Sequence, residues 1–79
     1  MNVSQKAFEM MKLDMTKELI VMLMEEENME METAMNVLYL SETYEKMSNP
    51  NTGLYYQSPG YVYSILDMEL KNGKLEGLN

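Results

Sequence analysis

The chain has 79 residues and a formal net charge of −7, which fits one small domain that packing alone must hold together. It contains no Cys and no His, which excludes disulfides, thiolate nucleophiles and ordinary zinc sites. It also lacks Arg, and thirteen acidic residues outnumber six Lys, so we expect no binding to nucleic acid or to anionic membranes.

The N-terminal third of the sequence predicts one long helix over residues 4–28. Strong helix formers fill this stretch, and neither Pro nor Gly occurs before Pro50. Ser4 is the expected N-cap, with Asp14 or Thr16 as alternatives, and the acidic run 25–27 disfavours continuation past Asn28. One apolar face follows the helical spacing: Phe8, Met11, Met15, Leu19, Met22 and Leu23.

A second, narrower apolar row lies off that face of the first predicted helix. It consists of Leu13, Ile20 and Met24. Three short helices cannot cover every side of a helix of about 24 residues. We therefore interpret this row either as deeper core or as a contact with a second chain.

Two shorter helices are predicted next, over residues 30–40 and 41–48. The apolar positions of the first have the spacing i, i+3, i+4 and i+7: Met31, Ala34, Met35 and Leu38. This face would continue at Glu42, which does not suit a core, so we expect a bend at Ser41, the N-cap of the next helix. The apolar face then restarts in a different phase at Leu40, Tyr44 and Met47.

The C-terminal part opens with the strongest turn signal of the chain, the sequence Asn-Pro-Asn-Thr-Gly at 49–53. We expect residues 54–57 to be extended or irregular. Ser58 and Pro59 then open a helix over 58–72, which Asn72 and Gly73 end. A β-strand over 61–65 is the alternative, because aromatic and β-branched residues dominate there. The apolar face of the helix would combine Tyr61, Ile65 and Met68 with Val62, Leu66 and Leu70.

These elements predict a small all-α bundle of about four helices, with a single domain over residues 1–73 and a disordered tail over 74–79. The N-terminus lacks the uninterrupted apolar stretch of a secretory signal, and no segment approaches a membrane-spanning run of about 20 apolar residues. We therefore expect a cytoplasmic protein that makes no membrane contact.

Four pieces of the sequence within residues 31–71 are similar to a known family: Glu-Thr-Ala-Met-Asn-Val-Leu-Tyr (32–39), Ser-Glu-Thr-Tyr-Glu-Lys-Met (41–47), Gly-Leu-Tyr (53–55) and Ser-Pro-Gly-Tyr-Val-Tyr-Ser-Ile-Leu (58–66). They resemble a family of short, uncharacterised bacterial proteins whose genes often lie in small operons. The resemblance implies a helical fold and an antitoxin-like role in neutralising a neighbouring gene product. It supplies no catalytic residues.

Carboxylates are the only groups in this chain that suggest site chemistry. Clustered glutamates could attract Ca²⁺ or Mg²⁺, but they lack the spacing of a binding loop, so we interpret them as a solvated helix end: Glu25, Glu26, Glu27, Glu30 and Glu32. Asp67 and Glu69 lie two residues apart on a helix and face apart, so they cannot act as an acid–base pair. We expect no catalytic residue, no cofactor and no metal, and predict that the protein is not an enzyme.

A helix-turn-helix could be drawn from the helices over 30–40 and 41–48. Its recognition helix would present Glu42, Thr43, Glu45 and Lys46, without the Arg that usually reads guanine. DNA binding is therefore the least favoured of three functions.

The favoured function is protein–protein interaction, either as a homo-oligomer or with a partner protein. All six Tyr lie between residues 39 and 63, where some must be core and others could form a binding surface. The candidate interaction surface comprises Leu13, Ile20, Met24, Tyr55, Tyr56 and Tyr63. The alternative is the antitoxin-like regulator, and no small-molecule substrate is identifiable.

Overall fold

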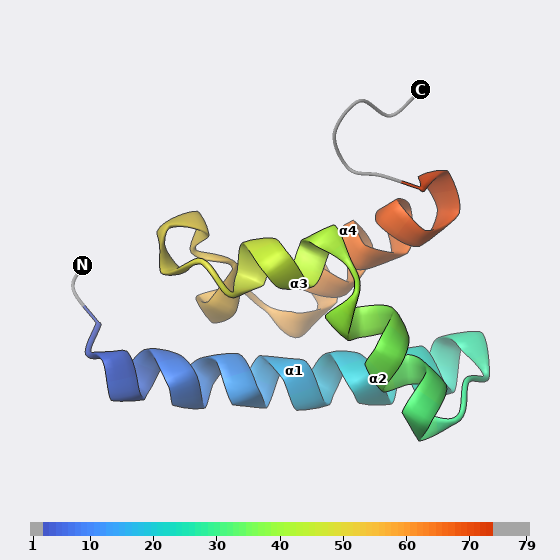
Figure 1. Ribbon diagram of the computed structural model, residues 1–79, viewed down its shortest axis with the longest axis horizontal. Helices are drawn as coiled ribbons and strands as arrows, with labels where there is room; N and C mark the ends of the chain where they lie inside the picture. Colours follow the sequence, from blue (N-terminus) through green and yellow to red (C-terminus); the bar gives the residue numbers. More distant parts are fainter. Residues whose placement is uncertain (1–2, 74–79) are drawn as a thin grey trace.

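The N-terminal helix α1 (Gln5–Glu27) is the longest element of the fold (Figure 1). In the computed structural model, which describes residues 3–73, the Ser4 side chain accepts a hydrogen bond from the Ala7 N–H at 3.1 Å. Asn28 follows the helix in the left-handed conformation, with φ of 59°, which Asn tolerates better than most residues. The helix predicted over 4–28 is confirmed, with Ser4 as its cap.

The chain bends between α2 (Met31–Tyr39) and α3 (Glu42–Met47) at a single buried serine. The Ser41 hydroxyl donates a hydrogen bond to the Leu38 carbonyl at 2.6 Å and accepts one from the Tyr44 N–H at 3.0 Å. One side chain therefore ends the first helix and caps the second. Both helices and the bend were predicted, and the structure confirms them.

Two short 3₁₀ helices, η1 (Pro50–Thr52) and η2 (Leu54–Tyr56), connect α3 to the last helix. The Thr52 hydroxyl donates to the Lys46 carbonyl at 2.6 Å, which ties the turn to α3. Gly53 lies between the two turns with φ of 73°, a conformation that favours glycine. Residues 54–57 were predicted to be extended or irregular. This is wrong for residues 54–56, which form η2, whereas Gln57 has an extended backbone.

The last helix, α4 (Pro59–Asn72), begins at Ser58, whose hydroxyl accepts from the Tyr61 N–H at 3.2 Å. Gly73 follows it with φ of 91°. The helix predicted over 58–72 is confirmed and the alternative strand over 61–65 is wrong, because the Ser-Pro start and the Gly stop outweigh local β propensity. The tail predicted over 74–79 lies outside the described residues.

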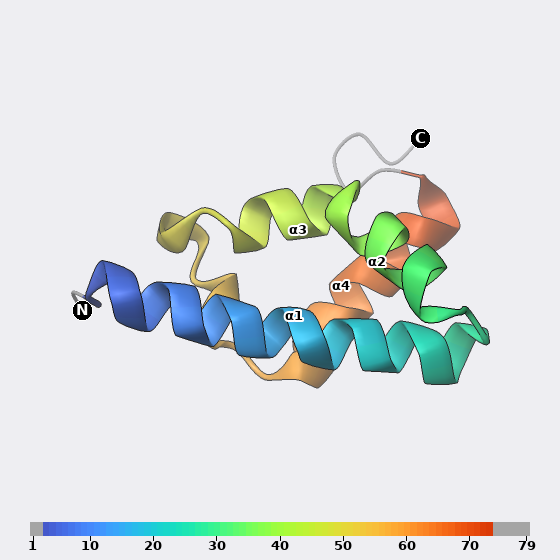
Figure 2. The same ribbon diagram turned by 60° about the horizontal axis from the view of Figure 1, so that its bottom comes forward.

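The elements after α1 lie on one side of it. Figure 1 shows α1 along one edge, with α3 and α4 above it and α2 crossing in front of its C-terminal part, and Figure 2 shows α2 and α3 above α1 with α4 behind it. The molecule is 35 Å long, and a helix of 23 residues is about 34 Å long, so α1 spans the whole long dimension. α1 contacts α2, η2 and α4, while α3 packs on α2 and α4.

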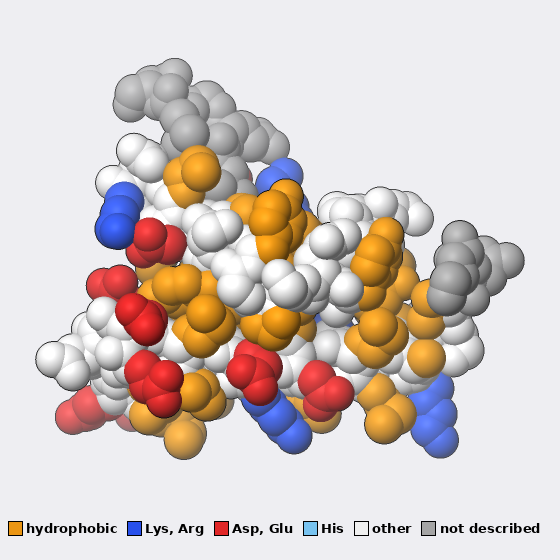
Figure 3. All heavy atoms as spheres, turned by 180° about the vertical axis from the view of Figure 1, so that it is seen from behind, with side chains coloured by type: hydrophobic (Ala, Val, Ile, Leu, Met, Phe, Trp, Pro, Cys, Tyr) orange, Lys and Arg blue, Asp and Glu red, His pale blue; other side chains and the backbone are white. Residues whose placement is uncertain are grey.

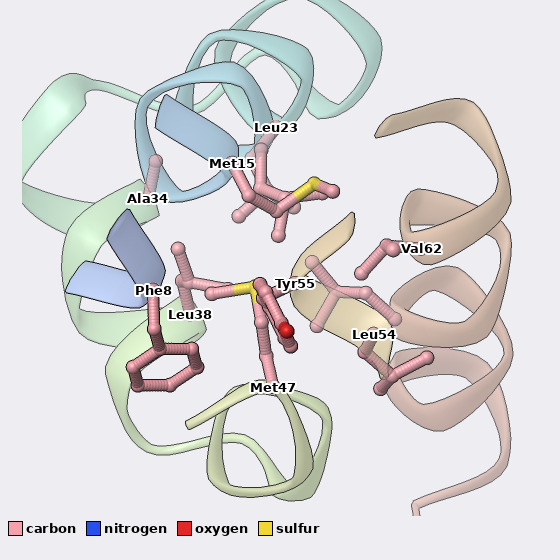
Figure 4. Close-up of a cluster of buried hydrophobic side chains, with 11 residues drawn as sticks. Phe8, Met15, Leu23, Ala34, Leu38, Met47, Leu54, Tyr55 and Val62 are labelled. Carbon is pink, nitrogen blue, oxygen red and sulfur yellow. The ribbon is translucent and has the colours of Figure 1, made fainter. Parts of the chain in front are cut away.

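The core lies between α1 and the other helices (Figure 4). Its buried apolar side chains are Phe8, Met15, Leu19, Leu23, Ala34, Leu38, Met47, Leu54, Tyr55, Val62 and Leu66. Most of the face predicted for the first helix is therefore buried. Two members lie at its margin, since Met11 is 38 % exposed and Met22 is only partly buried.

Leu40 was predicted to restart the apolar face, and this prediction is wrong. It is 87 % exposed, the highest value among the exposed large hydrophobic residues. Leu40 forms the C-cap of α2, and the Ser41 cap then turns the chain so that Thr43 faces inward. The other two predicted members of this face do pack inward, since Met47 is buried and Tyr44 is partly buried against the core. The apolar face does change phase between α2 and α3, as predicted, but the change begins after Leu40.

A carboxylate from α4 caps the N-terminus of α3. The Glu69 side chain is 7 % exposed and accepts hydrogen bonds from the Glu42 N–H at 2.7 Å and the Thr43 N–H at 3.0 Å. The Thr43 hydroxyl donates a third bond, at 2.8 Å. Negative charge is favourable at a helix N-terminus, so this contact joins α3 to α4 through both hydrogen bonds and the helix dipole.

Candidate interaction surface

Beside its buried face, α1 carries a second row of apolar side chains with a lysine at its centre. Its members recur at alternating spacings of three and four residues: Met10, Leu13, Lys17, Ile20 and Met24. We call this row the outer face of α1. Met10 is 59 % and Leu13 is 53 % exposed, and Val21 beside the row is 46 % exposed. Figure 2 brings the lower side of α1 forward, where no other described helix crosses it.

The three predicted residues of the first helix divide between two roles. Leu13 is exposed, whereas Ile20 and Met24 are partly buried and pack against the core. The row was predicted to be either deeper core or a contact surface. Its C-terminal half, with Ile20 and Met24, belongs to the margin of the core, and its N-terminal half, with Leu13, is exposed to solvent.

The two adjacent tyrosines of η2 have opposite environments. Tyr55 is 6 % exposed, and its ring meets the Phe8 ring edge-on, with 4.8 Å between ring centroids. Assigning Tyr55 to the surface was therefore wrong, because the 3₁₀ turn directs it into the core. Tyr56 is 59 % exposed and packs edge-on against Tyr55 at 5.1 Å, so its other side faces solvent.

Tyr63 lies on α4 near the C-terminal end of α1 and is partly buried. Its hydroxyl oxygen is shielded from solvent and meets no strict hydrogen-bond geometry within residues 3–73, but the Glu27 carboxylate lies near enough for a weak hydrogen-bond interaction with it. Burial raises the pKa of this hydroxyl above 10.0, and the negative charges of Glu27, Asp67 and Glu26 raise it further. Tyr63 therefore contributes to the contact between α1 and α4 and only partly to the exposed surface for which it was predicted.

The charges of α1 oppose its dipole at both ends. Its first turn contains Lys6 and no acid, and its last turn contains the glutamates 25–27 and no base. Helices favour the reverse arrangement by about 0.3–1 kcal/mol for each charge. In Figure 3 acidic side chains extend from one end of the lower edge past its middle, and lysines lie among them near the middle and toward the other end. Within residues 3–73, no salt bridge involves either Lys6 or Glu25.

Two shallow hollows lie on the described surface. The first, of about 240 Å³ between α1 and η2, is lined by Met11, Asp14, Met15, Glu18, Tyr55, Tyr56, Gln57 and Pro59. The second, of about 270 Å³ beside α3, is lined by Glu42, Glu45, Lys46, Asn49 and Thr52. Neither has an enclosed apolar chamber with converging polar groups, which is the usual form of a small-molecule site.

The acidic side chains of α4 point to different partners, as their spacing predicted. Asp67 pairs with Lys71 at 3.0 Å on the surface, while Glu69 caps α3. That cap also bears on the helix-turn-helix interpretation, since Glu69 takes the N–H groups at the start of the would-be recognition helix. No group of three or more acidic, His or Cys side chains that could hold a metal comes together within residues 3–73.

Sequence reasoning missed several exposed apolar residues. Tyr61 and Met68 were assigned to the apolar face of the last helix, yet they are 54 % and 47 % exposed. Val62 and Leu66 of the same predicted face are buried, whereas Leu70 is 40 % exposed. Glu69 completes the inward row with Val62 and Leu66, at i, i+4 and i+7. The sequence does show that Glu69 shares a helical face with Val62 and Leu66, which indicates that it is buried. Its capping of α3 could not be predicted, because it depends on where α3 lies.

Among residues 3–73, no helix is both long enough and apolar enough to cross a membrane. Comparison with known proteins finds no matching family model, no similar curated protein and no similar solved structure. The resemblance to short bacterial proteins therefore stays a prediction, and the surface of the chain must carry the functional argument.

Proposed function

We propose that this protein is a non-catalytic interaction module that binds another protein chain through the outer face of α1. The observation that carries the proposal is the exposure of Met10 and Leu13, at 59 % and 53 %, on a helix whose opposite side already supplies the core. A helix that needs only one buried face usually has polar residues on the other. Here Met10, Leu13 and Val21 are exposed outside the buried face, so α1 has further apolar surface to bury against a partner.

The composition supports a binding role over a chemical one. The chain lacks His, Cys and Arg, which are the residues most used for proton transfer near neutral pH, nucleophilic attack and phosphate binding. Methionine, by contrast, is abundant and adapts its shape to irregular partners. Contact through a Met-rich helix therefore suits this sequence better than catalysis does.

Site-specific photo-crosslinking tests the proposal. A photoreactive amino acid replaces Leu13 on the outer face, and a matched chain carries it at Leu40, which is 87 % exposed at the α2–α3 bend. In the cells that naturally produce the protein, we expect irradiation to give a discrete protein adduct from position 13 only. Mass spectrometry of the adduct identifies the bound chain. Equal labelling from both positions, or no adduct from position 13, would overturn the proposal.

A further inference from the structure

We propose that the partner on the outer face of α1 is a second copy of this chain, with the two α1 helices running antiparallel. This inference rests on the proposed function and specifies its partner. Three features of α1 support it: the spacing of the outer face, the distribution of charge along the helix and the length that is available for contact.

The spacing matches that of a helix built to pair with another helix. Met10, Leu13, Lys17, Ile20 and Met24 follow the alternating steps of three and four that define positions a and d of a heptad repeat. Lys6 extends the same spacing toward the N-terminus, four residues before Met10. Ile20 and Met24 also pack against the core, but Met10 and Leu13 are exposed in the monomer, and a two-helix contact would use the whole row.

The charges select the direction of the second helix. In a parallel pair, the Lys6 ends would lie side by side and so would the ends that carry the glutamates 25–27, so like charges would meet at both ends. In an antiparallel pair, the Lys6 end of each chain lies beside the end of the other chain that carries the glutamates 25–27. Each end of α1 then gains the charge that its own dipole favours and its own sequence lacks.

Lys17 at the centre of the row also fits the antiparallel arrangement. Antiparallel helices set a positions against d positions, which places Lys17 opposite Leu13 or Ile20 of the second copy rather than opposite itself. Its aliphatic stem packs on those side chains while the ammonium reaches solvent. A lone lysine in such a row limits affinity but fixes how the helices align.

The size of the contact sets the expected affinity. The face extends along a helix of 23 residues, about 34 Å, and two of its apolar members are already partly buried in the monomer. A single helix pair of this length falls below the area of a standard stable interface, about 800 Å² per partner. We therefore expect a reversible dimer with a Kd on the order of micromolar.

Chemical cross-linking tests the direction of pairing. The chain contains no Cys, so a single introduced cysteine is its only thiol that can react. Two single-cysteine variants, Lys6→Cys and Glu25→Cys, are treated with a bismaleimide of about 10 Å reach. The antiparallel dimer gives a covalent product only when the two variants are mixed. Cross-linking of either variant with itself would show parallel pairing and overturn the inference, while the proposed function would stand.

Charge reversal gives an independent test with a folding control built in. Lys6→Glu and Glu25→Lys each agree better with the α1 dipole, so each variant should fold at least as stably as the natural chain in urea. Each should nevertheless weaken self-association by about tenfold, since two like-charge contacts replace two opposite-charge ones. The double variant Lys6→Glu/Glu25→Lys should recover the original Kd. Failure of the double variant to recover it would count against antiparallel pairing.

Sedimentation velocity from about 1 µM to about 1 mM provides the Kd for each chain. A natural chain that stays monomeric throughout this range would overturn the inference. If the photo-crosslinking at Leu13 then yields a different protein, the interaction module is upheld with another partner. If it yields nothing, both proposals fail.

Discussion

The Glu69 carboxylate accepts hydrogen bonds from both the backbone N–H and the hydroxyl of Thr43, at 3.0 Å and 2.8 Å, across 26 residues of sequence. Both residues are buried, with Thr43 fully shielded from solvent. The start of α3 is thus satisfied by a neighbouring helix as well as by its own cap, Ser41. This contact makes the position of α3 depend on α4.

Replacing Glu69 with Gln should destabilise the fold by about 2 kcal/mol. The amide retains one acceptor oxygen but turns an NH₂ group toward N–H donors and loses the charge that the start of α3 favours. The measurement is the urea midpoint at constant m-value. Asp67→Asn is the matched control on the same helix, and it should leave the midpoint unchanged because the Lys71 partner is solvent-exposed. Equal losses in the two variants would contradict the capping role.

Two leucines on either side of Tyr39 should respond very differently to truncation. Leu38→Ala empties a fully buried position and should cost about 2–5 kcal/mol. Leu40→Ala removes a side chain that is 87 % exposed and should change stability by less than about 0.5 kcal/mol. Thermal or urea unfolding of the two variants measures the difference. A large loss from Leu40→Ala would mean that the bend at Ser41 directs this side chain inward.

Two glycines form a pair with opposite expected outcomes. Gly53→Ala should destabilise the fold by about 1–2 kcal/mol, because φ of 73° strains an L-residue and the new Cβ would lie 3.0 Å from the Tyr56 hydroxyl. Gly60 has ordinary helical geometry with nothing within 4 Å of a Cβ, so Gly60→Ala should stabilise by about 0.4–1 kcal/mol. Denaturant midpoints should rise in the order Gly53→Ala, natural chain, Gly60→Ala. The reverse order would contradict the turn geometry at Gly53.

Tyr63 should make folding stability sensitive to alkaline pH. Burial, then Glu27, Asp67 and Glu26, raise its pKa above 10.0, so the unfolded chain loses this proton first. Its contribution is therefore fully present below pH 10 and declines as the pH rises from there through the folded-state pKa.

The Tyr63→Phe variant isolates this effect from the titration of lysines. It removes a shielded hydroxyl that meets no strict hydrogen-bond geometry and has only the Glu27 carboxylate near it, so its stability at neutral pH should stay close to that of the natural chain. Between about pH 9 and pH 11 its urea midpoint should fall less steeply. Tyr61→Phe, at a residue 54 % exposed, should keep the original slope. Identical slopes for the Tyr63 variant and the natural chain would show that the hydroxyl is solvated.

The helices were predictable because the signals that start and end them are local. Ser4, Ser41 and Ser58 each accept a hydrogen bond from an N–H three residues later, and this pattern is legible in the sequence. The environments of single side chains were less predictable, because they depend on other elements. Tyr55 points inward because η2 turns, and Glu69 is buried because α3 lies above it.

The candidate surface was predicted in part. The row of Leu13, Ile20 and Met24 was visible from spacing alone, but the division of its members between core and solvent follows from where α2 and α4 pack. Met10 was overlooked because the spacing was counted from the buried face. The sequence alone shows that the charges at the two ends of α1 oppose its helix dipole. Relating these charges to helix pairing also required knowing which side of α1 stays uncovered.

The reliance of α3 on Glu69 has a consequence for protein synthesis. A helix of six residues is unstable in isolation, and the carboxylate that completes its start is added to the growing chain 26 residues after Thr43. While those residues are still inside the ribosome, α3 can pack only on α2 and the 3₁₀ turns, without the carboxylate that completes its start. Full stabilisation of α3 therefore waits for the emergence of α4, so that the middle of the chain completes its folding together with the C-terminal helix.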